Sequence, residues 1–270
     1  MSRSCRLIGI SRQALYQELQ RKREKARTLE PVLSWVHQIR RDLPRLGGRK
    51  LYHLLQPELE RQDIKLGRDG LFDLLRLHRL LIAPTRQYRK TTQSKHWMRK
   101  YPNLYQDMTL TQPEQAYVSD ITYLESLEGV HYLSLVTDAY SRKIVGHYVS
   151  DNLSTTSVVQ ALDQMLSERT SRGTAIHHSD RGLQYCSALY QSRLATQDIQ
   201  PSMTTGYDCY QNALAERING ILKGEFLIHK YRNRQELEQV VKESINAYNY
   251  KRPHTSLGMK TPAAVHEKAN

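Results

Sequence analysis

The sequence predicts an α/β fold in which a mixed sheet is flanked by helices, preceded by an all-α basic region. Three observations indicate this fold class: apolar residues at helical spacing up to about residue 83, a change to strand patterning near residue 117, and strands that then alternate with helices. With 270 residues, the chain has room for one large domain or two smaller ones. Hydrophobic residues make up 39% of the chain, which is enough for a packed core and excludes disorder throughout.

The composition also excludes several other classes of protein. The mean hydropathy is −0.66, and no apolar run reaches the roughly 18 residues of a membrane span, so we expect no transmembrane helix. The N-terminal residues lack the apolar stretch and cleavage site of a secretory signal. The three cysteines, at positions 5, 186 and 209, are scattered and odd in number, which indicates a reducing compartment and no disulfide framework. No paired Cys or His spacing suggests a zinc site.

The charge is distributed very unevenly along the chain. Residues 1–100 contain 24 Lys and Arg against 9 Asp and Glu, a net charge of +15, whereas residues 101–270 contain 16 against 18, a net charge of −2. The formal charge of +13 therefore originates entirely in the first 100 residues. A region this basic is typical of proteins that bind a polyanion, most often a nucleic acid; the alternative is a surface that is basic only for solubility.

The first region is expected to consist of basic helices. Gly9, followed by Ser11 as a helix N-cap and an apolar-periodic stretch to Tyr16, is typical of the second half of a helix-turn-helix, with a plain helical hairpin as the alternative. Charged and amphipathic helical patterns continue to residue 42, and two more helices are predicted over 49–59 and 69–81. The cations expected to contact DNA in this region are Arg12, Arg49 and Lys50.

Between the two regions the periodic pattern disappears. Residues 84–116 contain many cations and interleaved aromatic side chains, so we expect a linker that follows a phosphate backbone, or alternatively an ordinary tether. Tyr88, Trp97 and Tyr101 are its candidates for stacking on bases. The expected organisation is a helix-turn-helix-like basic region at 1–83, a cationic linker at 84–116, an α/β core at 117–230 and a C-terminal helix and tail at 231–270.

From residue 117 onward, β-rich and helical segments alternate. Three β-rich runs at hairpin spacing predict an antiparallel meander over 117–124, 130–138 and 143–150. A helix capped by Ser154 is expected next. The remaining predicted elements are a strand at 174–178, a helix near 184–196, a strand near 199–203, a helix near 211–223 and a long helix at 234–250. This order of elements resembles a ribonuclease H-like fold.

Three acidic residues fall where this order of elements would bring them together. Asp120 lies in the middle of the first predicted strand, Asp180 directly follows the fourth, and Glu216 lies within a predicted helix. A carboxylate in a central strand is costly unless it is paired or binds a cation. Carboxylates alone select a hard cation such as Mg²⁺ over zinc, and three of them suffice to hold two such ions about 4 Å apart. The alternative is three unrelated surface or capping acids.

The segments around these acids resemble a known family. They are DITY at 120–123, SRKIVG at 141–146, HSDRG at 178–182 and NALAERIN at 212–219, followed by YN at 248–249, RPHTSLG at 252–258 and TP at 261–262. Together they resemble the integrase-like DDE transposases encoded by the second reading frame of bacterial insertion sequences, which are related to retroviral integrases. The resemblance is strong over about 117–265 and looser over 1–100. Many relatives have an acid before the Asn-Ala pair; this chain has Gln211 there, and Asp208 lies three residues earlier.

The resemblance implies a transposase that catalyses Mg²⁺-dependent cleavage and transfer of DNA strands. Asp120, Asp180 and Glu216 would be the catalytic residues and the ligands of two Mg²⁺ ions, with Mn²⁺ able to replace them. Asp120 and Asp180 would share the ion that activates the attacking hydroxyl, and Asp120 and Glu216 the ion at the leaving oxygen. The implied partners are double-stranded DNA at element ends and target, further copies of the chain, and an upstream-frame helix-turn-helix protein. The implied location is the bacterial cytoplasm, at the nucleoid.

Two other functions remain open from the residues alone. A catalytically silent protein derived from a transposase would bind element ends, although binding needs no buried carboxylate cluster. A ribonuclease H-like nuclease would explain the α/β core but not the basic helical region. Mg²⁺-dependent nicking of duplex DNA would distinguish these functions from transposition.

Further residues near the acids are candidates for DNA contacts. Lys223 follows Glu216 by two helical turns and would contact a phosphate, as the equivalent cation does in the family; a solvated helix-end lysine is the alternative. Asn212 is expected to orient a ligand or contact DNA, or only to cap its helix. For Gln184 and Tyr185, DNA contact and simple packing are equally favoured.

Four other polar residues are expected to be structural. His177 and His178 are interpreted as strand residues rather than metal ligands, because they lie within a predicted strand. Asp138 is interpreted as a turn acid at the end of the second strand. His254 is expected to pack the C-terminal tail onto the sheet.

Overall fold

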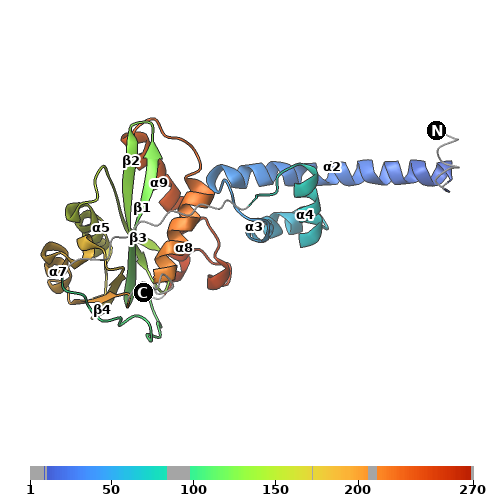
Figure 1. Cartoon of the computed structure of the whole chain (residues 1–270). Helices are drawn as coiled ribbons and strands as arrows, with labels where there is room; N and C mark the ends of the chain where they lie inside the picture. The colour runs from blue at the N-terminus through green and yellow to red at the C-terminus, as the bar shows by residue number, and fades with distance from the viewer. Residues whose placement is uncertain (1–8, 10, 84–97, 172, 206–211, 269–270) are drawn as a thin grey trace. The chain divides into compact units, whose positions relative to one another are not determined.

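The chain folds as two compact units, residues 1–82 and 83–270 (Figure 1). The computed structural model describes residues 9, 11–83, 98–171, 173–205 and 212–268. The predicted stacking residues Tyr88 and Trp97 lie outside these ranges, as do Cys5, Cys209, Asp208 and Gln211. Among the described helices, none is both long and apolar enough to cross a membrane.

The described part of the N-terminal unit begins with one long helix, α2 (Arg12–Asp42). As predicted, Ser11 is its N-cap: the Ser11 hydroxyl oxygen accepts a hydrogen bond from the backbone N–H of Ala14 at 3.0 Å. The predicted short helix ending near Tyr16 is wrong, because α2 continues without a break for 31 residues. No glycine interrupts it, and i, i+4 pairs such as Glu18–Lys22 support its exposed first half.

Two shorter helices, α3 (Gly48–Arg61) and α4 (Arg68–Leu77), complete this unit. Leucines at three- and four-residue spacing face its core from both helices: Leu51, Leu55 and Leu59 in α3 and Leu71, Leu74 and Leu75 in α4. As predicted, α4 begins after Gly67, but it ends four residues earlier than expected. Arg79 adopts a left-handed φ of 56° just beyond it, which no α-helix can continue.

The C-terminal unit is built on a five-stranded sheet of order β3-β2-β1-β4-β5 (Figure 1). The strands are β1 (Ala116–Ser126), β2 (Gly129–Asp138), β3 (Ile144–Ser150), β4 (Ala175–Ser179) and β5 (Ile199–Met203). The first three form the predicted antiparallel meander, and β4 and β5 add in parallel beside β1. β1 is therefore central, with β2 on one side and β4 on the other.

Helices follow the strands largely as predicted. They are α5 (Thr155–Glu168), α6 (Leu183–Cys186), α7 (Ala188–Ala195), α8 (Ala213–Ile221), α9 (Arg234–Tyr250) and α10 (Pro262–Glu267), with a π turn η2 (Leu222–Phe226) and a 3₁₀ turn η3 (Thr255–Leu257). The helix predicted near 184–196 is two helices, because Ser187 leaves the helical conformation and caps α7. The helix predicted to reach residue 223 ends at Ile221, where the π turn begins.

Residues 98–115, expected to belong to the linker, are part of the C-terminal unit and contact its sheet and core. The backbone N–H of Leu104 donates to the Ser202 hydroxyl at 2.9 Å. Tyr101 is half-buried against the main hydrophobic core, and the Arg99 guanidinium lies 5.1 Å from its ring centroid. The ring of Tyr101 is thus engaged in packing.

Helix α5 approaches the sheet very closely at Gly146 of β3. A Cβ atom added to this glycine would lie 2.1 Å from the backbone oxygen of Ala161 in α5. Around this contact, Val158, Leu162 and Met165 of α5 are buried in the core. Gly146 therefore sets the spacing between this helix and the sheet.

We expect Gly146→Ala to lower the free energy of unfolding by about 1–3 kcal/mol or more, because α5 must move away from β3. Urea denaturation of the full chain measures the change. Gly220→Ala is the matched control, since no atom lies within 4 Å of its added Cβ and alanine favours a helix. An unchanged unfolding midpoint for Gly146→Ala would show that the two elements are not in contact there.

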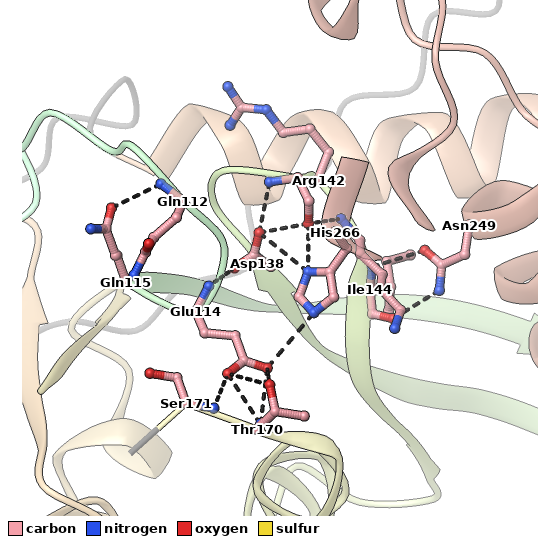
Figure 2. Close-up of polar contacts among 12 residues, drawn as sticks. Gln112, Glu114, Gln115, Asp138, Arg142, Ile144, Thr170, Ser171, Asn249 and His266 are labelled. Carbon is pink, nitrogen blue, oxygen red and sulfur yellow. Dashed lines mark hydrogen bonds and ion pairs between the residues drawn. The ribbon is translucent and has the colours of Figure 1, made fainter. Parts of the chain in front are cut away.

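The C-terminal segment is attached to the sheet by buried polar groups (Figure 2). Asp138, at the end of β2, is completely buried. Its carboxylate accepts hydrogen bonds from the backbone N–H of Glu114 at 2.7 Å and from the N–H and hydroxyl of Ser141, both at 2.6 Å. The ring of His266 in α10 lies between the carboxylates of Glu114 and Asp138, with one ring nitrogen 3.8 Å from an oxygen of each. Asp138 thus stabilises the turn after β2, as expected, and also contacts His266 of α10.

A second attachment comes from the segment around residues 248–254. The Asn249 side chain pairs with both backbone groups of Ile144, accepting at 2.9 Å and donating at 2.8 Å. His254 is buried, and its ring meets the Tyr248 ring of α9 edge-on at 5.0 Å between centroids. Helix α9 is therefore attached to the first residue of β3 through Asn249, and His254 of the tail packs against α9.

Candidate active site

Asp120 lies on the central strand β1, opposite Leu135 of β2. Its Oδ2 atom accepts a hydrogen bond of 2.7 Å from the side-chain amide of Asn219, which belongs to α8. Burial raises the pKa of Asp120 most, and the negative charge of Asp180 raises it further. Hydrogen bonds from Ile121 and Asn219 oppose this, and the resulting pKa is about 7.

Asp180 follows the last residue of β4, the parallel neighbour of β1. Its Oδ1 atom accepts a hydrogen bond of 2.9 Å from the backbone N–H of Gly182, which fixes the carboxylate at the strand end. The next residue, Arg181, donates through Nε to the backbone oxygen of Thr204 at 2.6 Å, so the loop is held to the segment after β5.

Glu216 lies in the first turn of α8, where its side chain is exposed. Its pKa is raised by partial burial of the carboxyl group and then by the charge of Asp180. Because Asp120 and Glu216 both respond to Asp180, the fold brings the three predicted carboxylates into one electrostatic neighbourhood. Carboxyl groups whose pKa values are raised by burial and by a neighbouring acid are typical of sites that bind a cation or transfer protons. Within the described ranges, no three His, Cys, Asp or Glu side chains form a closed metal-binding cluster.

Helix α8 is held against β1 by two asparagines seven residues apart. Asn212 donates to the backbone oxygen of Ser119 at 3.1 Å, and Asn219 donates to Asp120. Both side chains are buried, and neither Oδ1 atom has a hydrogen-bond partner among the described groups. Asn212 occupies the N-cap position of α8, but its side chain bonds to the strand instead of capping the helix.

Asn219 was not among the residues singled out from the sequence. Its position in the sequence could have suggested a role at the site. Asn219 follows Glu216 by three residues and Asn212 by seven, which places all three on adjoining faces of one helix. That spacing alone does not show that its amide reaches Asp120, because the contact depends on how α8 crosses β1.

Lys223 contacts β1, but it does so from a different local conformation than the α-helix that the sequence predicted. It lies in the π turn η2, not in a continuous α-helix. Its ammonium nitrogen is 3.4 Å from the hydroxyl oxygen of Thr122. Thr122 is two residues after Asp120, and side chains two apart on a strand share a face. Lys223 is therefore on the same side of β1 as Asp120.

Gln184 and Tyr185 are engaged within the fold. The Gln184 side chain donates to the backbone oxygen of Leu153 at 3.1 Å. Tyr185 is only 2% exposed, and its ring meets that of Tyr190 edge-on at 5.3 Å. For Tyr185, packing is thus the interpretation that the structure favours over DNA contact.

The two adjacent histidines of β4 are buried strand residues, as expected. His177 Nε2 lies 2.7 Å from the Ser119 hydroxyl and 2.8 Å from that of Tyr190. Burial lowers the pKa of His177 to about 3, so its ring is neutral. His178 Nδ1 lies 2.9 Å from the Ser202 hydroxyl. The two rings thus link β4 to β1, α7 and β5.

The remaining candidate cations belong to the N-terminal unit. Arg12 is exposed in the first turn of α2. Arg49 is exposed and Lys50 half-buried in the first turn of α3. Exposure of the two arginines leaves them accessible to a phosphate backbone.

The strand order and the position of the acids define a ribonuclease H-like core of the integrase type. The family described as "Integrase core domain" matches residues 111–209, and a second family with the same description matches 197–262. An intasome chain of simian T-cell lymphotropic virus, solved with PP2A regulatory subunit B56 gamma, shares the fold with a TM-score of 0.50 and 17% identity over 82% of this chain and 70% of that chain.

Two proteins of Shigella sonnei are similar along most of the chain. The 31 kDa protein of insertion element IS600 is 34% identical over 98% of this chain and 97% of its own length. The transposase for insertion sequence element IS629 is 33% identical over 83% of this chain and 74% of its own length. The chain belongs to the integrase-core family of insertion-sequence transposases, which are polynucleotidyl transferases that cleave and transfer DNA strands. The resemblance inferred from the sequence motifs is confirmed, and a nuclease or a silent binding protein is not favoured.

Proposed function

We propose that Asp120, Asp180 and Glu216 are the catalytic carboxylates with which this transposase cleaves the ends of its insertion element and transfers them to target DNA. The observation that carries the proposal is their convergence: a strand, a strand end and a helix each supply one acid, and the charge of Asp180 raises the pKa of the other two. Chance placement of unrelated surface acids would give no such coupling.

We further propose that these acids hold divalent cations, two Mg²⁺ ions with Mn²⁺ as a substitute. The donor set fits: it consists of carboxylate oxygens, which hard cations prefer, and the neighbouring histidines are turned to other partners. When bound, such ions would make the attacking hydroxyl more acidic and stabilise the leaving 3′ oxygen. Asp120, on the central strand of the sheet, would be the shared ligand.

The chain's own residues have defined tasks in this proposal. Asn219 holds Oδ2 of Asp120 through a neutral donor, which fixes the carboxylate without adding charge. Lys223, on the same side of β1, would bind a phosphate of the DNA end as a compact positive charge.

The test uses the full chain and duplexes that carry the ends of the element encoding it. We expect nicked products with free 3′ hydroxyls, and joined products, in Mg²⁺ or Mn²⁺ but not in EDTA. Equal cleavage in EDTA would contradict the metal proposal. Digestion of an RNA–DNA hybrid without any joining of DNA would instead favour a ribonuclease H-like activity.

We also propose that the basic N-terminal part supplies most of the affinity for duplex DNA, with several copies of the chain assembling on it. Residues 1–97 contain 22 Lys and Arg against 9 Asp and Glu, a net charge of +13, whereas residues 98–270 contain 18 of each and are neutral. An upstream-frame partner and a nucleoid location stay predictions from the resemblance.

We expect a fragment of residues 1–97 to bind duplex DNA with an affinity that falls steeply as salt rises, because each phosphate neutralised adds about −0.9 to the log–log salt slope. The N-terminal unit has its own buried leucine core, which favours independent folding. Fluorescence anisotropy against salt concentration measures the slope. Residues 98–270 serve as the comparison, and equal affinity and slope for both fragments would contradict the argument from charge.

A further inference from the structure

Arg252, which is buried, and Glu225, which is 22% exposed, form an ion pair that none of the proposed catalytic steps uses. The Arg252 side chain is 2% exposed and is among the largest fully buried side chains of the described residues. Its Nε and Nη2 atoms donate to the two oxygens of Glu225, at 2.8 and 2.6 Å respectively. The third nitrogen, Nη1, lies 3.1 Å from Nε2 of His254. The pairing is the two-pronged geometry that only arginine makes with a carboxylate.

Glu225 belongs to the same five-residue π turn as Lys223. In this turn Leu222 and Phe226 point into the core, and the backbone N–H of Leu227 closes the wide ring on the oxygen of Leu222 at 2.8 Å. A π turn is a rare conformation that is often found at functional sites. Arg252, 27 positions further along the chain, contacts this turn from the segment after α9.

The pair also has an electrostatic consequence for Lys223. Glu225 is only two residues away, and an unneutralised carboxylate at that distance would compete with a phosphate for the lysine charge. The bidentate pair occupies both oxygens of Glu225. An ion pair taken partly out of water contributes little net stability compared with apolar packing, which favours a role in fixing one conformation of the turn.

We propose that Arg252 is a positioning residue for Lys223: through Glu225 it holds the π turn in the form that places the lysine ammonium beside Thr122, and it keeps the charge of Glu225 away from the DNA phosphate. The inference rests on the proposed function, because it assumes that Lys223 contacts DNA. It assigns a task in catalysis to the RPH segment at 252–254, which lies far from the acids in sequence.

The test compares Arg252→Lys with Lys223→Ala and with the double variant, in the full chain. Arg252→Lys keeps the charge but loses the two-pronged pairing. We expect each single variant to reduce the salt slope of binding to an element-end duplex, measured without divalent metal, by about 0.9, the value of one phosphate contact. We expect strand transfer in Mg²⁺ to fall about tenfold, since small misplacements of a binding group are costly. The double variant should be no worse than Lys223→Ala, because both act through the same contact.

Arg232→Lys is the matched control, since it makes the same exchange in an exposed Arg–Glu pair of the same unit and should leave slope and transfer unchanged. Glu225→Gln is the second variant if Arg252→Lys folds poorly, as judged by circular dichroism. A lower melting temperature with an unchanged salt slope, or losses that add up in the double variant, would make Arg252 merely structural and overturn the inference. An unchanged slope for Lys223→Ala would overturn it too, whereas the proposed catalytic function is decided separately by Asp120→Asn.

Discussion

Asp120→Asn, Asp180→Asn and Glu216→Gln are each expected to reduce DNA cleavage and strand transfer by a factor of about 10³ or more, equivalent to about 4 kcal/mol of activation free energy. Each substitution keeps the shape of the side chain but removes one negative charge from the cluster. A cation would then lose a ligand, whereas duplex affinity, which depends on Lys and Arg, should stay nearly constant. Gel assays of cleavage and joining and anisotropy with the same duplex measure the two effects.

Asp107→Asn is the control for these variants, because Asp107 is an exposed acid of the same unit. The three variants should also melt no lower than the unaltered chain in the absence of metal, since each removes repulsion between neighbouring carboxylates. Near-normal strand transfer by any one of them would remove that residue from the catalytic set. Loss of DNA binding in parallel with activity would instead indicate a folding defect.

Local patterns in the sequence were sufficient to predict most of the C-terminal fold. The hairpin spacing of the β-rich segments, with a turn at Glu128-Gly129, predicted the three-stranded meander, and Ser154 was correctly placed as the cap of α5. The long helix at 234–250 was predicted with its observed bounds. In each case the signal is a short-range one, a cap, a turn or a period, which needs no knowledge of distant contacts.

Contacts between distant segments could not be predicted in the same way. The hydrogen bond from Asn219 to Asp120 joins residues 99 apart, and it exists only because α8 crosses β1 at this point. The π turn at Leu222–Phe226 also depends on distant partners, since nothing in the local sequence distinguishes it from one more turn of α-helix. Helix α2 shows the opposite error: a motif at its start suggested a short helix, but the helix continues to Asp42 and even includes Pro31.

The structural importance of Asp138 was underestimated from the sequence, because it also depends on contacts with distant segments. As a turn acid it would be half solvated and tolerant of change, but the fold buries it completely beneath α10. Burial alone would raise its pKa. The nearby His266 ring and hydrogen bonds from Ser141 and the backbone of Glu114 outweigh burial and hold the pKa of Asp138 below its ordinary value. The carboxylate is therefore charged at neutral pH and serves as the acceptor for a ring of buried donors (Figure 2).

We expect Asp138→Ala to lower the free energy of unfolding by about 3–5 kcal/mol, because it leaves the backbone N–H groups of Glu114 and Ser141 buried without their acceptor and removes one partner of the Ser141 hydroxyl. Asp138→Asn should also destabilise, since its NH₂ group would face one of these donors. Urea denaturation with circular dichroism measures both variants, and Asp107→Ala provides the exposed control.

The pH dependence gives this prediction a second readout. A carboxylate whose pKa is lowered by folding stabilises the protein above its unfolded pKa, and that contribution disappears as the pH falls through the folded value. The difference in free energy of unfolding between the unaltered chain and Asp138→Asn should therefore be largest at pH values above 3.8, the ordinary pKa of aspartate. It should become smaller as the pH falls below that value. A difference that stays constant as the pH falls would mean that the charge of Asp138 does not hold the network, and that the hydroxyl and backbone bonds around Ser141 suffice to attach α10 to the sheet.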